Sequence, residues 1–204
     1  MSTISRKERE RMARRDEILE SAATVFAEHG YNGATIQEVA QRAELSVGTL
    51  YNFFENKQEL FNKLIVREAR RLHEGLREAM AEAASPREKI VAYIRACMQE
   101  LGKRLDLARL YVETVQATRF GLPAGLDEEG ASIDREFDAE LEAVVAEGIR
   151  RGELADMPPQ AVVALLGGMM NAVALKVIQD GDTTNLDRYA EACQRMVNEG
   201  LWGE

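Results

Sequence analysis

Residues 35–60, TIQEVAQRAELSVGTLYNFFENKQEL, decide the fold of this chain, because they predict two short helices joined by a tight turn. Thr35 and Glu38 form a capping-box pattern, which predicts a helix that begins at Ile36. After a three-residue turn, Ser46 can cap a second helix. Two short helices in this arrangement form a helix-turn-helix, whose second helix enters the major groove of DNA.

The second helix of this motif begins with small side chains, which would allow its backbone to come close to the base edges. Thr35, Tyr51 and Lys57 can donate hydrogen bonds to phosphates, and a helix N-terminus at Lys57 adds partial positive charge. Leu50 and Phe54 are expected to face inward. The residues expected to contact DNA are Thr35, Ser46, Val47, Gly48, Thr49, Tyr51, Asn52 and Lys57.

The same stretch resembles the DNA-binding domain of the TetR family of transcriptional regulators. The matching positions are Thr-x-x-x-Val-Ala-x-x-Ala at 35–43, Ser-x-Gly-Thr-Leu-Tyr at 46–51, Phe54, and Lys-x-Glu-Leu at 57–60. Ile18, Ala22, Phe26 and Gly30 resemble the first helix of the family. Many members carry a polar His where this chain has Phe53, so we expect one phosphate contact to be missing. The alternative interpretation is a helical hairpin with ordinary core packing.

The charge of the chain is unevenly distributed. The formal net charge is -9, but residues 1–15 hold six basic side chains against two acidic ones. An acidic body behind a basic arm would orient the protein on DNA and discourage binding by the wrong face. The alternative is that the arm is only a solvated helix start.

The sequence favours a cytoplasmic protein, associated with the nucleoid when bound to DNA. The N-terminus is charged and lacks the apolar run of a signal peptide. The most apolar segment, 161–178, is short and interrupted for a membrane span, so no membrane partner is expected. Cys97 and Cys193 are too few for a disulfide framework and lack metal-ligand spacing. We expect Cys97 to be buried in a helix, with a redox-sensing thiol as the alternative, and neither a metal nor a cofactor is expected.

The clearest boundary is Ser-Pro-Arg-Glu at 85–88, a capping box with proline at the first helical position. We therefore expect a helix-turn-helix domain at 13–73 and a C-terminal domain at 86–204. Apolar residues recur at helical spacing throughout, and no strand alternation is present. The expected fold class is all-α, with an N-terminal helix-turn-helix DNA-binding domain and a C-terminal helical domain for ligand binding and dimerisation.

The segment 158–179 is apolar nearly all round and must be covered on every side. We expect a second copy of the chain to supply part of that cover, because helices 131–151 and 158–179 resemble the four-helix dimer interface of the family. Full burial within one subunit is the alternative. The residues expected at the interface are Phe137, Leu141, Val145, Val162, Leu166, Met169, Met170 and Val173.

The resemblance also implies a mostly apolar cavity in the C-terminal domain. A small molecule bound there would change the separation of the two DNA-binding domains of the dimer. The candidate lining residues are Tyr93, Met98, Tyr111, Thr114, Val115, Thr118 and Arg119. Such residues at helical spacing are also typical of ordinary core. His73 is interpreted as a surface or packing residue, with a ligand or a switch as the alternative.

These observations favour a homodimeric, sequence-specific DNA-binding regulator, most simply a repressor that a small, largely apolar ligand releases from a palindromic double-stranded operator. Catalysis is not expected, since the two histidines lie in no metal motif and no G-x-S-x-G, P-loop or G-x-G-x-x-G sequence is present. A helical protein-binding adaptor is the alternative, but it would not explain the residues from Thr35 to Lys57.

Overall fold

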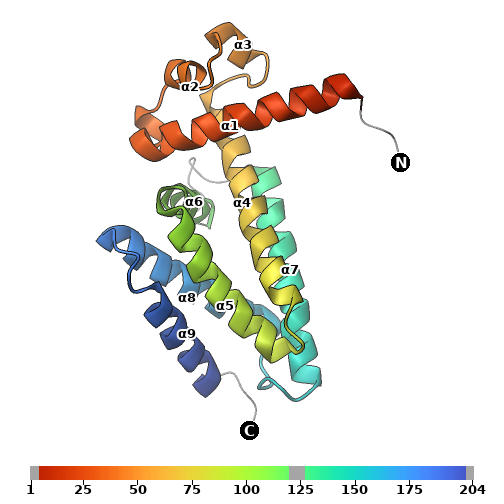
Figure 1. Ribbon diagram of the computed structural model, residues 1–204. Coiled ribbons are helices and arrows are strands. Elements are labelled where there is room, and N and C mark those ends of the chain that lie inside the picture. Colours follow the sequence, from red (N-terminus) through yellow and green to blue (C-terminus); the bar gives the residue numbers. More distant parts are fainter. Residues whose placement is uncertain (1–4, 120–126, 201–204) are drawn as a thin grey trace. The chain divides into compact units, whose positions relative to one another are not determined.

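The computed structural model describes residues 5–119 and 127–200, without the side chains of residue 113 and residues 115–119. Every regular element in these ranges is a helix, which confirms the expected all-α class. The helices are α1 (Arg6–Gly33), α2 (Ile36–Arg42), α3 (Val47–Tyr51), α4 (Lys57–Ala81), α5 (Pro86–Lys103), α6 (Leu105–Arg119), α7 (Glu128–Arg150), α8 (Pro159–Asp180) and α9 (Leu186–Gly200) (Figure 1).

Side-chain caps fix where several helices begin. The Thr35 hydroxyl accepts from the Glu38 amide at 3.2 Å, and the Glu38 carboxylate accepts from the Thr35 amide at 2.8 Å. The Ser85 hydroxyl caps α5 by accepting from the Glu88 amide at 3.2 Å, but the Glu88 carboxylate accepts from the Ala84 amide, at 2.9 Å, and not from Ser85. These starts agree with the sequence, because a cap depends on residues only three positions apart.

Gly30 marks the one break inside α1. Its φ of 67° and ψ of 174° are not helical, and a short further turn carries the helix to Gly33. A side chain is strained at this positive φ, so glycine is the residue that suits the position. The turn that follows Gly30 was not expected from the sequence.

The chain forms two compact units that divide within α4, between Arg67 and Glu68. The N-terminal unit contains α1, α2, α3 and the first part of α4. Its core includes Ile18, Phe26, Leu50, Phe54, Leu60 and Leu64, all nearly inaccessible to solvent.

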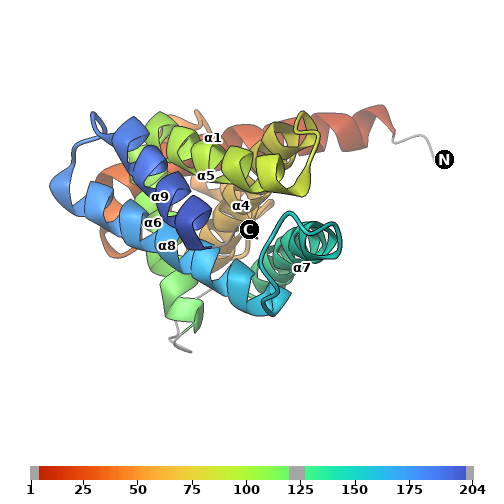
Figure 2. The same ribbon diagram turned by 90° about the horizontal axis from the view of Figure 1, so that it is seen from below.

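The C-terminal unit contains the rest of α4 and helices α5 to α9. Helix α5 is central in it, since α5 packs against α6, α7, α8 and α9, and α9 runs alongside α5 in both views (Figures 1 and 2). Leu76 and Met80 of α4 belong to the same core. This packing explains why the unit begins at Glu68, before the cap at Ser85 where the sequence led us to start the second domain.

Candidate functional sites

The turn between α2 and α3 has a defined geometry. The amide of Leu45 donates to the Ala40 carbonyl at 2.8 Å, and the amide of Glu44 donates to the Gln41 carbonyl at 3.1 Å. This pair of bonds is a Schellman ending, which requires a left-handed residue, and Glu44 supplies it with a φ of 55°. Leu50, fully buried, anchors α3 to its neighbours. The turn therefore holds the start of α3 at the surface of the N-terminal unit.

The start of α3 is open to an approaching partner. Ser46, Gly48, Tyr51 and Asn52 are exposed, while Val47 and Thr49 are half-buried. The Ser46 hydroxyl accepts from the Thr49 amide at 3.0 Å, so it also caps the helix. A Cβ on Gly48 would have only the Ser46 hydroxyl oxygen within 4 Å, at 3.9 Å. The fold itself therefore does not require glycine here.

Thr35 and Lys57 have internal partners besides any role toward DNA. Thr35 is exposed, but its hydroxyl donates to the Glu38 carboxylate at 2.7 Å. That hydrogen bond holds the pKa of Glu38 below its usual value. The Lys57 ammonium donates to the carbonyls of Tyr31 at 2.8 Å and Ala34 at 3.1 Å, and it lies 4.7 Å from the centre of the Tyr31 ring. Lys57 thus ties the end of α1 to the start of α4, which the sequence did not indicate.

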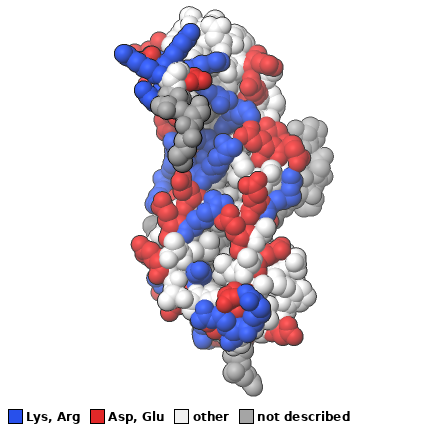
Figure 3. Space-filling model, turned by 90° about the vertical axis from the view of Figure 1, so that its right-hand side faces the viewer, with Lys and Arg blue, Asp and Glu red and all other residues white. Residues whose placement is uncertain are grey.

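Basic side chains from α1 lie over the two phenylalanines that follow α3. The Arg11 guanidinium is 5.9 Å from the centre of the Phe53 ring, and that of Arg15 is 5.1 Å from the Phe54 ring. The position at which many family members have a polar His is therefore occupied by Phe53, whose ring lies under the Arg11 guanidinium. Lys and Arg side chains gather around the start of α1 (Figure 3). Residues 6–15 are helical, and all of them are exposed except the half-buried Arg15.

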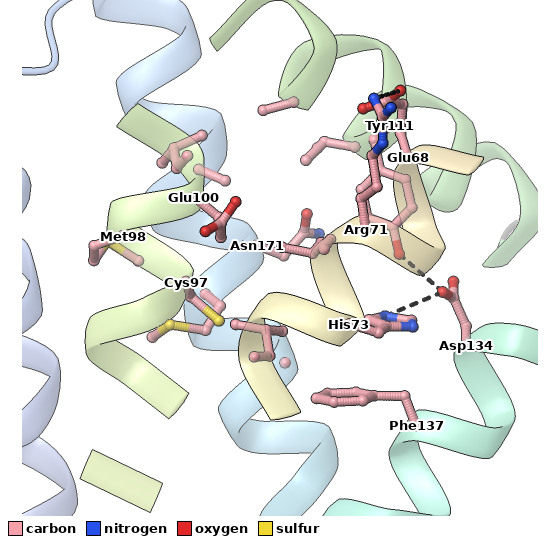
Figure 4. A pocket seen from close by; sticks show the side chains of 18 of the residues that line it. Glu68, Arg71, His73, Cys97, Met98, Glu100, Tyr111, Asp134, Phe137 and Asn171 are labelled. Carbon is pink, nitrogen blue, oxygen red and sulfur yellow. Dashed lines mark hydrogen bonds and ion pairs between the residues drawn. The ribbon is translucent and has the colours of Figure 1, made fainter. Parts of the chain in front are cut away.

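A cavity of about 300 Å³ lies within the C-terminal unit, walled by helices α4 to α8 (Figure 4). Its wall is mostly apolar, but it also contains Glu100, Asp138, Asn171 and two groups of interacting polar side chains. In the first group, the Tyr111 hydroxyl donates to an Asp134 carboxylate oxygen at 2.8 Å, and His73 Nε2 lies 3.6 Å from the same oxygen. In the second group, a Glu68 carboxylate oxygen lies 3.3 Å from the Arg71 guanidinium, and the other oxygen lies 3.5 Å from the Arg104 guanidinium.

His73 is held as a neutral imidazole. Burial, aided by the nearby charge of Arg77, lowers its pKa to about 4, and Glu140 opposes this only in part. The ring stacks on Phe137, with centroids 4.3 Å apart and planes 8° from parallel. His73 Nδ1 is buried and has no hydrogen-bond partner among the described residues.

The cavity contains three of the seven residues expected to bind a ligand, Tyr93, Met98 and Tyr111. Thr114 is buried outside its wall, where its hydroxyl donates to the Leu110 carbonyl at 2.6 Å. The side chains of Val115, Thr118 and Arg119 lie outside the described residues. Sequence reasoning missed the lining residues His73, Asp134, Phe137 and Asn171. Only the position of His73 on an otherwise apolar helix face could have drawn attention to them.

The two cysteines show no sign of an activated thiol. Cys97 lines the cavity, and burial raises its pKa to about 12. Burial also raises the pKa of Cys193. Thiols with raised pKa values are protonated at neutral pH and react slowly, which favours the packing interpretation of Cys97. Within residues 5–119 and 127–200, no group of His, Cys, Asp and Glu side chains could hold a metal ion.

The residues expected at a dimer interface mostly face the core of their own subunit. One of these residues, Phe137, stacks on His73 in the cavity wall. Met169 and Val173 are half-buried. The remaining six are buried in the C-terminal unit, namely Phe137, Leu141, Val145, Val162, Leu166 and Met170. Because α8 is apolar all round, the sequence could not show which of its sides faces inward.

The opposite face of α8 is exposed and also apolar. Leu165 is 63% exposed, one of the largest exposed hydrophobic side chains described. The other exposed residues along this face are Ala161, Ala164, Gly168 and Ala172, and the charged Lys176 follows one turn later. By length and composition alone, α8 could cross a membrane, but a core helix of a soluble protein meets the same criterion. In this structure α8 packs against α5, α6 and α7.

Comparison with known proteins assigns the family. Residues 18–64 match the family model described as bacterial regulatory proteins, tetR family, and residues 83–201 match the tetracyclin repressor-like C-terminal domain. The chain therefore belongs to the TetR family of transcriptional regulators. Members of this family are DNA-binding regulators without enzymatic activity, in agreement with the expectation from sequence.

Relatives along most of the chain are named regulators. The transcriptional repressor AcnR of Corynebacterium diphtheriae is 26% identical over 196 residues, which are 90% of this chain and 91% of that protein. The fatty acid metabolism regulator protein of Bacillus subtilis is 25% identical over 138 residues, 68% of this chain and 69% of that one. The solved structure of FadR from Bacillus subtilis with stearoyl-CoA has the same fold, with a TM-score of 0.76 and 20% identity over 89% of this chain and 96% of that chain.

Proposed function

We propose that this chain is a dimeric, sequence-specific repressor that a small, largely apolar ligand releases from a palindromic operator. The observation that carries the proposal is the continuity of α4. Its first residue, Lys57, belongs to the N-terminal unit, and its residues Leu72, His73 and Leu76 line the cavity. A ligand in the cavity would therefore contact α4, the same helix whose first part belongs to the DNA-binding unit. As in the family at large, such a protein would act in the cytoplasm, at the nucleoid when bound to DNA.

For DNA binding, we assign base-edge contacts to the start of α3 and phosphate contacts to the residues around it. The free space around Gly48 supports close approach of the α3 backbone to the DNA bases. Exposure of Ser46 and Tyr51 supports their contact with DNA. Thr35, Asn52 and Lys57 would contact phosphates, and Lys57 would do so only in addition to holding α1. The helical basic arm at residues 6–15 would add phosphate contacts, so binding should weaken steeply with salt.

For dimerisation, we assign the interface to the exposed face of α8, centred on Leu165. An apolar stripe of this kind on a helix is typical of a surface that a partner covers. Its alanines and Gly168 would allow two helices to approach closely. A two-fold dimer then requires a palindromic operator, with half-sites roughly 34–36 Å apart, one turn of DNA.

For the ligand, the size and apolar wall of the cavity support a small, mostly apolar effector. The relative FadR of Bacillus subtilis, solved with stearoyl-CoA, supports an effector with an alkyl chain. Linkage fixes the scale of the response: a hundredfold loss of operator affinity corresponds to about 2.7 kcal/mol of coupling, and operator DNA must weaken ligand binding equally.

The test begins with fragments of DNA that flank the gene for this chain, screened by mobility shift. A thermal-shift screen of metabolites then identifies compounds that stabilise the protein, and each is titrated with and without the bound fragment. We expect at least one compound to bind less tightly in the presence of operator. A cavity ligand whose affinity is the same with and without operator would contradict the proposed release.

A further inference from the structure

Two arginines of α1 lie beside the end of α3. The Arg11 guanidinium is 5.9 Å from the centre of the Phe53 ring, and the Arg15 guanidinium is 5.1 Å from the centre of the Phe54 ring. Arg11 and Arg15 are one helical turn apart, so they share a face of α1. Helix α3 ends at Tyr51, just before these two rings in the sequence. Helix α1 thus places two cations next to the C-terminal end of α3.

Arg11 differs from Arg6 and Arg14 of the same helix in having no acidic partner among the described residues. Arg6 is paired with Glu10 at 2.8 Å, and Arg14 is paired with Glu17 at 2.7 Å. The Arg11 side chain is exposed, and in the part of the chain that the structure describes it interacts with the Phe53 ring alone. Its charge is therefore available to an anion from outside the chain.

The surface at Arg11 is hollowed and has a net positive charge. The hollow is lined by Glu8, Arg11, Met12, Arg15 and Phe53. The carboxylate of Glu8 accepts from the Ser5 amide at 2.8 Å, as part of the cap of α1. Two guanidinium groups thus outnumber one carboxylate that the helix cap already uses. Such a surface attracts a phosphate group.

The Phe53 ring can position Arg11 without using its hydrogen-bond donors. A guanidinium within about 6 Å of a ring centre is attracted by the π electrons of the ring. This attraction restricts the arginine side chain, so less conformational freedom is lost when the side chain binds DNA. The N–H groups remain for a phosphate, which arginine can bind through two parallel hydrogen bonds.

We propose that Arg11 binds a phosphate of the DNA backbone beside the end of α3, and that the Phe53 ring positions its guanidinium for this contact. The phosphates of both strands border the major groove, so a cation next to the end of a helix in the groove can reach one of them. The phosphate contact expected to be missing at Phe53 would then come from α1. This inference deepens the proposed DNA binding and rests on it.

Fluorescence anisotropy of the full chain at several salt concentrations tests the phosphate contact. The probes are a labelled duplex from a fragment that the protein shifts and an unrelated duplex of equal length. Arg11→Ala should weaken binding to both duplexes by a similar factor, about tenfold or more. The slope of log affinity against log salt should become shallower by about two, because each subunit of the proposed dimer loses one phosphate contact. Arg11→Lys keeps the charge and should retain most of the slope.

Arg6→Ala is the matched control. It removes the same charge from the same helix, but Arg6 is paired with Glu10 and lies on a different side of α1 from Arg11. Affinity should fall less than about twofold, with the salt slope unchanged. Equal losses in Arg6→Ala and Arg11→Ala would mean that only the net charge of the arm matters, and would overturn the proposal.

A double-mutant cycle tests whether Phe53 positions Arg11. Phe53→Leu keeps an apolar side chain but removes the ring, so affinity should fall about fivefold, whereas Phe53→Tyr keeps the ring and should bind normally. In the Arg11→Ala background, Phe53→Leu should cause no further loss. Thermal unfolding verifies that each variant is folded, and Phe53→Met replaces Phe53→Leu if the latter is not.

The outcomes separate this inference from the proposed function. Unchanged affinity and salt slope in Arg11→Ala would overturn the phosphate contact, even if the protein binds its operator. An equal loss from Phe53→Leu with and without Arg11, or no loss at all, would overturn the positioning role of Phe53. A chain that shifts no DNA fragment would contradict the proposed function itself, and this inference with it.

Discussion

At the scale of single residues, His73 links the stability of the protein to pH. Its pKa is lowered to about 4 by burial, whereas a histidine in the unfolded chain titrates near 6.5. Arg77 contributes to the lowering, and Glu140, which is hydrogen-bonded to Arg77 at 2.6 Å, opposes it. Between these two pKa values the unfolded chain binds a proton that the folded chain does not. The free energy of unfolding must therefore fall as the pH falls from about 6.5 to about 4.

His73→Phe should flatten this part of the pH dependence. The variant lacks the titrating group, so the loss of unfolding free energy between pH 7 and pH 4.5 should shrink by about 2–3 kcal/mol. Urea denaturation of both proteins at the two pH values measures it. An identical pH dependence in His73→Phe and the unaltered chain would mean that His73 titrates normally.

Gly48→Ala should separate DNA binding from folding. The added methyl group meets only the Ser46 hydroxyl oxygen, at 3.9 Å, so the fold accommodates it and the midpoint of thermal unfolding should not fall. If α3 approaches the bases closely, the same methyl group meets DNA, and operator affinity should drop about tenfold or more. Fluorescence anisotropy with labelled operator measures the loss. Unchanged affinity would place Gly48 away from the DNA.

At the scale of elements, local signals were predictable and the choice of faces was not. The caps at Thr35, Ser46 and Ser85 are set by residues three positions apart, so the sequence alone located these helix starts. The Lys57 ammonium donates hydrogen bonds to carbonyls more than twenty positions earlier in the chain, and no local sequence pattern predicts such a contact. The inward side of α8 and the grouping of His73 with Asp134 likewise depend on tertiary packing.

Two glycines test how closely the helices of the C-terminal unit pack. A Cβ on Gly148 would lie 2.6 Å from Leu154 Cδ1 and 3.0 Å from Pro86 Cβ, so Gly148→Ala should destabilise the protein by about 1–3 kcal/mol. A Cβ on Gly168 of α8 would meet nothing within 4 Å in its own subunit. Gly168→Ala should therefore stabilise an isolated subunit by about 1 kcal/mol through helix propensity. Urea denaturation compares the two variants, each combined with Leu165→Arg to keep the subunit monomeric. Equal effects would contradict the packing described for Gly148.

At the scale of the whole molecule, the exposed face of α8 should join two copies of the chain. Leu165→Arg places a charge on that face without entering the core, so the variant should stay helical but sediment as a monomer at micromolar concentration, where the unaltered chain should sediment as a dimer. Met12→Arg is the matched control, because Met12 is exposed to a similar extent, 58%, in the N-terminal unit. A Leu165→Arg protein that remains a dimer would move the interface elsewhere.

Dimerisation and DNA reading meet in the operator itself. Footprinting of the protein on a DNA fragment that it shifts, repeated with Leu165→Arg, examines both together. A ligand-released dimeric repressor should protect two inverted half-sites with centres roughly one turn of DNA apart, and the monomeric variant should lose most of this protection. Protection of a single half-site at full affinity, or protection independent of sequence, would contradict a dimer that reads a palindrome through α3.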